Sequence, residues 1–135
     1  MKKGILILSL VTAAILTQSF QDKPKFDLKA SMAKGKEVYT TYCMSCHMEA
    51  GEGIDDVYPP LAKSDYLMAD KARSIKQVLY GASGSMKVNG KTYNAEMTGF
   101  DLTDQEVSDL LNYIRNSFGN KGPAIMPEEV KAQRK

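Results

Sequence analysis

Apolar side chains recur at helical spacing in the middle of the chain. Residues 31–42 place small and apolar side chains at three- and four-residue steps, which predicts an amphipathic helix with Ser31 as its N-cap. Residues 64–69 fit one short helical turn. Residues 70–79 predict a further helix, which begins with an aspartate suited to the N-cap and is ended by Gly81.

The most distinct helical pattern lies in the last third of the chain. Thr103 and Glu106 have the spacing of a capping box, in which each side chain binds a backbone N–H of the other residue. An apolar stripe follows, and Gly119 predicts the end of this helix. The stripe consists of Val107, Leu110, Leu111, Ile114 and Phe118.

Between these helices the chain has little helical periodicity. Residues 49–58 predict an acidic loop, which is either simply solvated or attracts a basic partner. Residues 59–61, with the sequence Pro-Pro-Leu, favour extended backbone. Asn89-Gly90 is a strong signal for a two-residue turn, so we predict a small β-hairpin around it, ahead of Met97.

The first twenty residues have the pattern of a secretory signal peptide. Lys2 and Lys3 precede an apolar run at residues 5–16 and a polar end with a small residue. The run is short for a membrane span, although an uncleaved N-terminal anchor is the alternative. We therefore expect residues 1–20 to export the chain to the periplasm.

The rest of the chain divides into three parts. Residues 21–30 are polar and predict a linker, and residues 31–120 are long enough for one domain. Residues 121–135 predict a polar tail, either frayed or available to dock a partner. Within this tail, residues 128–133 fit a short surface helix.

Charge and composition exclude some classes of function. Lys2 and Lys3 account for the formal net charge of +2, so the chain without its first twenty residues is neutral. No basic patch indicates a nucleic-acid partner. The chain has no tryptophan and only 4 phenylalanines, so its core is thin, and a large apolar cofactor would add much of the buried surface.

Cys43-Met44-Ser45-Cys46-His47 is the most informative motif. The pattern C-x-x-C-H is typical of covalent haem c attachment, in which two thiols add to the vinyl groups of one porphyrin and the histidine binds its iron. His47 is the only histidine. A thioredoxin-like dithiol would be expected beside a βαβ pattern, which is absent. A zinc site would lack its fourth cysteine or histidine ligand, and a structural disulfide is the other alternative.

A second axial ligand to the iron would come from the opposite side of the haem. Because the chain has no second histidine, a methionine is the natural candidate. Met86 and Met97 both lie in the irregular segment between two predicted helices. We predict Met97, which precedes a well-capped helix and is followed by Gly99, with Met86 as the alternative. If neither binds, the iron has an open site.

Residues 32–119 resemble class I cytochromes c, in particular a bacterial subgroup. The resemblance implies an all-α cytochrome c fold, with about four to five helices around one covalently bound haem and a small hairpin before the axial methionine. It implies that Gly35 and a nearby aromatic pack against the last helix, and that the carbonyl of Pro59 accepts a hydrogen bond from Nδ1–H of His47. This subgroup often has a proline after the axial methionine and a tryptophan at position 118. Thr98 and Phe118 occupy these positions here.

The expected function is electron transfer, without catalysis by the chain itself. Cys43 and Cys46 would hold the haem, His47 and Met97 its iron, and Tyr93 and Tyr58 would contact the haem or simply pack. The alternative is a haem enzyme or gas-binding protein with an open distal site. That alternative requires that Met97 not bind the iron, which leaves an exchangeable site for peroxide, CO or NO. No second histidine or distal arginine favours peroxidase chemistry, since we expect Arg73 and Arg115, both on predicted helices, to face solvent.

The expected partners are redox proteins that donate and accept electrons. The resemblance implies a carrier that serves, or is a subunit of, a larger redox enzyme, which includes membrane-associated oxidoreductase complexes. The chain would then be a monomer or one subunit of such a complex.

Overall fold

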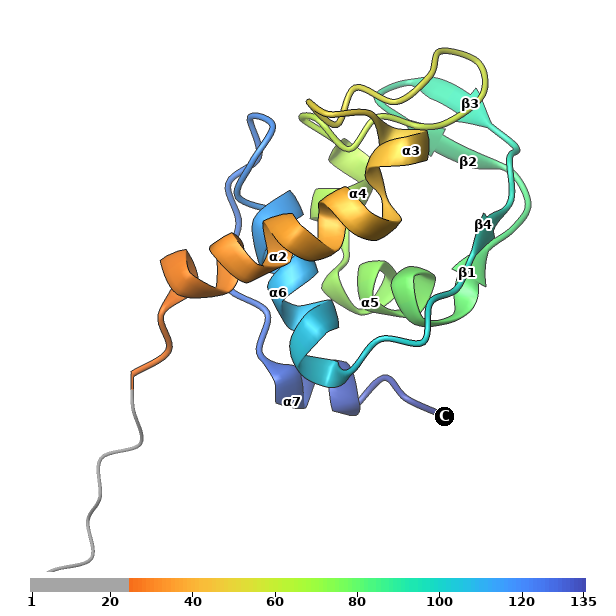
Figure 1. The fold of residues 1–135 in the computed structure, drawn as a ribbon. Coiled ribbons are helices and arrows are strands. Elements are labelled where there is room, and N and C mark those ends of the chain that lie inside the picture. Colours follow the sequence, from red (N-terminus) through yellow and green to blue (C-terminus); the bar gives the residue numbers. More distant parts are fainter. Residues whose placement is uncertain (1–24) are drawn as a thin grey trace, which may run out of the picture.

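The computed structural model describes residues 25–135, so the expected signal peptide and the start of the expected linker lie outside the described residues. Within this part the chain forms six helices and four short strands (Figure 1). The helices are α2 (Leu28–Tyr42), α3 (Met44–His47), α4 (Asp65–Ala69), α5 (Lys71–Tyr80), α6 (Asp104–Ile114) and α7 (Pro127–Lys131). The strands are β1 (Gly81–Ala82), β2 (Met86–Val88), β3 (Lys91–Tyr93) and β4 (Met97–Thr98). The helical class is confirmed, with more helices than the four to five expected.

Helix α2 begins earlier than the sequence indicates. Its N-cap is Asp27, whose carboxylate accepts a hydrogen bond from the backbone N–H of Ala30 at 3.0 Å. The prediction of Ser31 as N-cap is therefore wrong. Ser31 lies inside the helix and donates to the carboxylate of Asp109 at 2.5 Å. Its hydroxyl makes a contact between two helices, which no local sequence pattern reveals. Residues 28–30, expected to belong to the linker, are part of this helix.

Helices α2 and α6 cross at Gly35, as expected. A Cβ atom on Gly35 would lie 1.9 Å from the backbone oxygen of Asp109, so only glycine permits this approach. Next to the crossing, the ring of Tyr39 lies 5.6 Å from that of Tyr113 and 5.2 Å from that of Phe118, between centroids. These tilted aromatic contacts pack across the crossing and stabilise it.

The predicted caps of α5 and α6 are confirmed. Asp70 caps α5, and Thr103 and Glu106 form the capping box of α6. Ser64, for which no cap was predicted, caps α4. However, α6 ends at Ile114, four residues before Phe118. Phe118 has a φ of 57°, which turns the chain and directs its ring back onto Tyr39.

The two pairs of strands close the side of the molecule opposite α2 (Figure 1). The predicted hairpin is confirmed: β2 and β3 pair antiparallel around Asn89 and Gly90, with φ values of 49° and 84°. The pairing of β1 with β4 was not predicted. It sets Ala82, just after α5, beside Met97.

Residues 121–135 are not a frayed tail. Ile125 and Val130 are fully buried, and α7 packs against α6. Asn112 on α6 holds the segment, since its side chain accepts from N–H of Ile125 at 2.7 Å and donates to the carbonyl of Ile125 at 2.9 Å. Polar composition hid this docking because it depends on two apolar side chains and one buried amide.

Candidate haem-binding site

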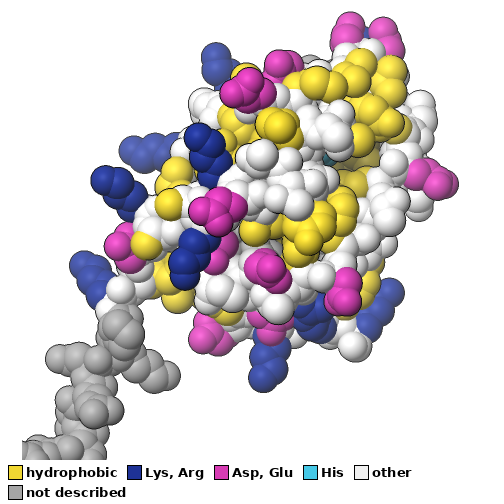
Figure 2. All heavy atoms as spheres, in the orientation of Figure 1, with side chains coloured by type: hydrophobic (Ala, Val, Ile, Leu, Met, Phe, Trp, Pro, Cys, Tyr) yellow, Lys and Arg dark blue, Asp and Glu magenta, His cyan; other side chains and the backbone are white. Residues whose placement is uncertain are grey.

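A cavity of about 430 Å³ lies between α3, α5, α6 and the strands. This volume falls in the range of cofactor pockets, about 300–1,000 Å³. Figure 2 shows the hollow with apolar side chains around it and the single histidine visible inside. Its inner wall is apolar, from Leu67, Val78, Leu110, Leu111 and Ile114.

Helix α3 and its N-cap residue Cys43 present the motif residues to this cavity. Cys43, Cys46 and His47 all line it. The backbone N–H groups of Cys46 and His47 donate to the carbonyl of Cys43, at 3.2 Å and 2.9 Å, which forms one tight helical turn. Residues three and four positions apart share a helix face, so the turn places both thiols and the imidazole on the same side. Both cysteines carry free thiols, and burial raises the pKa of Cys43 to about 12.

The ring of His47 is oriented by a backbone oxygen. Its Nδ1 lies 3.0 Å from the carbonyl oxygen of Pro59, which can only accept a hydrogen bond. Burial lowers the pKa of His47, against the opposing effect of the Pro59 carbonyl. The neutral ring therefore carries its proton on Nδ1 and leaves the Nε2 lone pair free to bind a metal.

The loop that supplies Pro59 is held by its own backbone. Gly53 N–H donates to the carbonyl of His47 at 3.0 Å, and Leu61 N–H donates to the carbonyl of Gly51 at 2.7 Å. Gly53 has a φ of 67°, and a Cβ there would lie 2.4 Å from the oxygen of Tyr58. The loop is thus more than a solvated acidic run.

The acidic side chains of this loop have a basic partner elsewhere in the chain. Lys91 on β3 forms ion pairs with Asp55 at 2.5 Å and with Asp56 at 2.8 Å. These pairs join the loop to the hairpin at the surface, so part of the loop's negative charge is neutralised by a lysine of the same chain.

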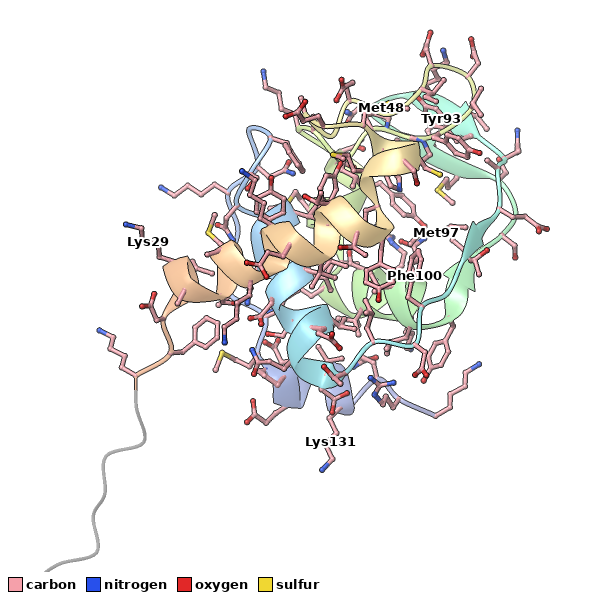
Figure 3. All side chains as sticks on the ribbon, in the orientation of Figure 1. Lys29, Met48, Tyr93, Met97, Phe100 and Lys131 are labelled. Atoms are coloured by element: carbon pink, nitrogen blue, oxygen red, sulfur yellow. The ribbon has the colours of Figure 1, made fainter. Side chains whose placement is uncertain are left out.

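Both candidate methionines line the cavity, from different strands. Met97 lies on β4 and points into the region enclosed by the strands and α5 (Figure 3). Met86 lies on β2. The two segments differ in support. Met97 belongs to β4, which pairs with β1 directly after α5. Met86 belongs to the β2–β3 hairpin, which is held instead by the ion pair of Lys91 with Asp55 and by the hydrogen bond from Asn89 N–H to Asp65.

The predicted tyrosine contacts differ from each other. Tyr58 lines the cavity, but Tyr93 does not, and it is buried opposite Met86 in the hairpin. Among the polar residues of the wall that were missed are Gln77 and Tyr66. The side-chain amide of Gln77 donates to the hydroxyl of Tyr66 at 3.2 Å. Gln77 is three residues after Ser74, which also lines the cavity, so the helical face of α5 held a signal for it.

The expectation that Arg73 and Arg115 face solvent is wrong. Arg115 is 2% exposed and donates to the carbonyl of Leu67 at 2.7 Å, and burial lowers its pKa. Arg73 is partly buried, and its guanidinium lies 3.7 Å above the ring centroid of Tyr66. Both support the wall of the cavity from behind, because Leu67 and Tyr66 line it.

These residues fit a covalently attached haem. Two free thiols lie beside one neutral imidazole with an available nitrogen. The thioether of a methionine on β2 or β4 can approach from elsewhere on the cavity wall. The mostly apolar wall suits a porphyrin, and the soft sulphur of methionine suits iron.

Comparison with known proteins supports this assignment. The family model "Cytochrome c" matches residues 32–118. A cytochrome c-552 of Thermus thermophilus is 35% identical over 117 residues, which cover 79% of this chain and 78% of that protein. The cytochrome c subunit of a quinone alcohol dehydrogenase from Gluconobacter oxydans is 34% identical over 68% of this chain. The match spans only 20% of that subunit's length.

A further relative is a subunit of a cbb3-type cytochrome c oxidase from Azospirillum, 32% identical over 67% of this chain and 30% of that protein. Matches to both a small cytochrome and parts of larger subunits are typical of a module used alone or within assemblies. The extent of the family match, together with the motif and the cavity, shows that this chain belongs to the cytochrome c family, whose members bind haem c covalently and transfer electrons.

Proposed function

We propose that this protein carries single electrons on one haem c, attached through Cys43 and Cys46 and ligated by His47 and Met97. The observation that carries the proposal is the convergence of both thiols, the oriented imidazole and the methionine on one apolar cavity. The bound haem supplies the change of redox state at its iron. The residues of the chain determine how that iron is held and how little water reaches it.

Each proposed ligand has a structural reason for its role. The hydrogen bond from His47 to Pro59 fixes the ring and makes Nε2 a stronger donor. A methionine as partner favours the reduced iron and so raises the potential. Met97 is favoured over Met86 because β4 pairs with β1 directly after α5, and because the chain just after Met97 is bonded to α5 through Phe100 N–H and the carbonyl of Val78.

Electron transfer is favoured over a haem enzyme or gas-binding protein with an open iron site. The family match supports the first, and two methionines at the cavity are available to fill the sixth position. The chain itself then serves as a carrier, and any catalysis belongs to its partner. A contact between Tyr93 and the haem stays a prediction.

The partners are redox proteins, by analogy with relatives that are dehydrogenase and oxidase subunits. We propose export to the periplasm by residues 1–20, where the chain exchanges electrons with a larger, membrane-associated enzyme. Across residues 25–135, no helix combines the length and the apolar character that a membrane crossing needs. Membrane attachment through an uncleaved residue 1–20 segment is tested by the mass of the mature protein.

Two methionine variants test the ligand assignment. In the oxidised holoprotein, Met97→Ala should abolish the weak long-wavelength band of sulphur–iron(III) bonding, lower the potential and permit prompt binding of CO after reduction. Met86→Ala, the matched control from the same cavity, should keep the band and the potential. Loss of the band in the Met86 variant alone would reverse the assignment, and prompt CO binding by the unaltered protein would favour the open-site alternative.

A further inference from the structure

Residues 97–102, here called the distal segment, carry Met97 from β4 to the start of α6. The first part of this segment is held tightly against α5. A Cβ on Gly81 would lie 2.2 Å from the carbonyl oxygen of Met97, and a Cβ on Gly99 would lie 2.6 Å from that of Leu79. Phe100 N–H donates to the carbonyl of Val78 at 2.9 Å. The backbone of Met97 can therefore move away from the cavity only when this segment leaves α5.

The other end of the distal segment is held by a residue far along the chain. Arg134 donates through its terminal guanidinium nitrogen to the carbonyl of Leu102 at 2.5 Å and through Nε to the carboxylate of Asp104 at 2.5 Å. Leu102 is buried, at 3% exposure, so this anchor joins the core. One planar guanidinium thus fixes both the end of the segment and the first residue of α6.

The residues on either side of Arg134 bind Tyr80, the last residue of α5, next to the distal segment. Tyr80 Oη donates to the carbonyl of Gln133 at 3.4 Å, and Lys135 N–H donates to Tyr80 Oη at 2.7 Å. Tyr80 is also the residue whose backbone lies against Gly99. Figure 1 shows the chain after α7 running beneath α5 toward this end. Residues 133–135 lie beyond residues 32–118, which the family model matches.

We propose that Arg134 is a positioning residue that keeps Met97 in place, and that it thereby limits replacement of the methionine by external ligands. The inference rests on the proposed function, since it takes Met97 as the ligand. Release of the Leu102 end would lower the free energy needed to lift the distal segment from α5. The ligand-exchanged form should then be more populated, without any change in the residues that touch the haem.

The test is the affinity of the oxidised holoprotein for imidazole, measured by optical titration. Arg134→Ala should bind imidazole about three- to tenfold more tightly, the factor expected for loss of one partly exposed, charged hydrogen-bonded contact. Arg134→Lys keeps the positive charge but loses the planar guanidinium that reaches both acceptors. Its imidazole affinity should therefore lie between those of the unaltered protein and Arg134→Ala. Hydrogen exchange at the Phe100 amide, measured without added ligand, should accelerate in Arg134→Ala.

Lys71→Ala is the matched control. Lys71 holds the same C-terminal region through Glu129 at 2.6 Å and the carbonyl of Ala124 at 3.2 Å, but from the first residue of α5. Both variants should lower the denaturation midpoint, whereas only Arg134→Ala should raise imidazole affinity. Equal effects in both, or none in Arg134→Ala, would overturn the proposal.

The ligand assignment is checked separately with Met97→Ala. If that variant keeps the sulphur–iron(III) band, the proposed ligand set is wrong, whatever Arg134→Ala does. If the band is lost and Arg134→Ala still leaves both imidazole affinity and Phe100 exchange unchanged, the ligand set stands and the positioning role of Arg134 is refuted.

Discussion

Gly35 on α2 and Asp109 on α6 meet backbone to backbone, and a Cβ on Gly35 would lie 1.9 Å from the carbonyl oxygen of Asp109. The same carboxylate-bearing residue accepts a hydrogen bond from Ser31 on α2. The crossing of α2 and α6, the two longest helices within residues 25–135, therefore depends on one missing side chain and one buried polar contact. This crossing supports the wall that α6 gives to the cavity.

Gly35→Ala should separate the two helices and destabilise the holoprotein by about 2–3 kcal/mol, as expected for overpacking against rigid backbone. The gain in helix propensity offsets only part of this cost. Denaturant unfolding of the holoprotein is the measurement. Lys34→Ala, an exposed change one residue earlier on the same helix, should have little effect. A Gly35 variant as stable as the original would contradict the tight crossing.

Asn112→Ala should detach the C-terminal segment from α6. The N–H of Ile125, fully buried, would lose its acceptor, and its carbonyl would lose one of two donors, at a cost of about 2–4 kcal/mol. Denaturant unfolding and hydrogen exchange at Ile125 would measure the loss. Asn94→Ala makes the same chemical change at an exposed site and should be nearly neutral. Unchanged protection of Ile125 in the Asn112 variant would argue against the contact.

Glu106→Gln should destabilise the protein at neutral pH but less so in acid. Hydrogen bonds from the side chain and backbone of Thr103 lower the pKa of Glu106 below its ordinary value. A carboxyl with a lowered folded-state pKa stabilises above its unfolded pKa of about 4.3, and the contribution is lost as pH falls through the folded value. The difference in melting temperature between the two proteins should therefore shrink from pH 7 toward pH 3.

The control for this pH dependence is Glu37→Gln, which removes an exposed carboxylate from α2. It should show no comparable narrowing with pH. A constant difference between Glu106→Gln and the unaltered protein across the range would mean that the ionised capping box does not contribute.

Cys46→Ser should sharply reduce the yield of folded holoprotein. One of the two proposed thioether bonds would be missing, so the haem would be held less securely. The apolar wall of the cavity of about 430 Å³ would then lose the group that packs against it. Intact mass and recovered yield from an export-competent host are the measurements. Ser45→Ala, between the two cysteines, should mature normally. Full recovery of a stable haem-free Cys46 variant would be inconsistent with a haem-dependent fold.

Much of the helical framework was predictable because its signals are local. The capping residues Asp70 and Thr103 act within one helical turn, and Asn89-Gly90 encodes its own turn. The motif that begins at Cys43 was equally local, since its spacing alone brings two thiols and one imidazole to a single helix face. Such features need no knowledge of the rest of the chain.

The tertiary structure decided what depends on distant partners. The hydroxyl of Ser31 suits an N-cap by its local sequence, but in the folded chain it binds Asp109 on another helix. Arg115 was expected in solvent, but it is buried and donates to the carbonyl of Leu67. The pairing of β1 with β4, which supports Met97, is too short to leave a periodic signal. Side chains thus encode their own turn of helix or strand, while long-range hydrogen bonds and close backbone approaches appear only when the whole chain is packed.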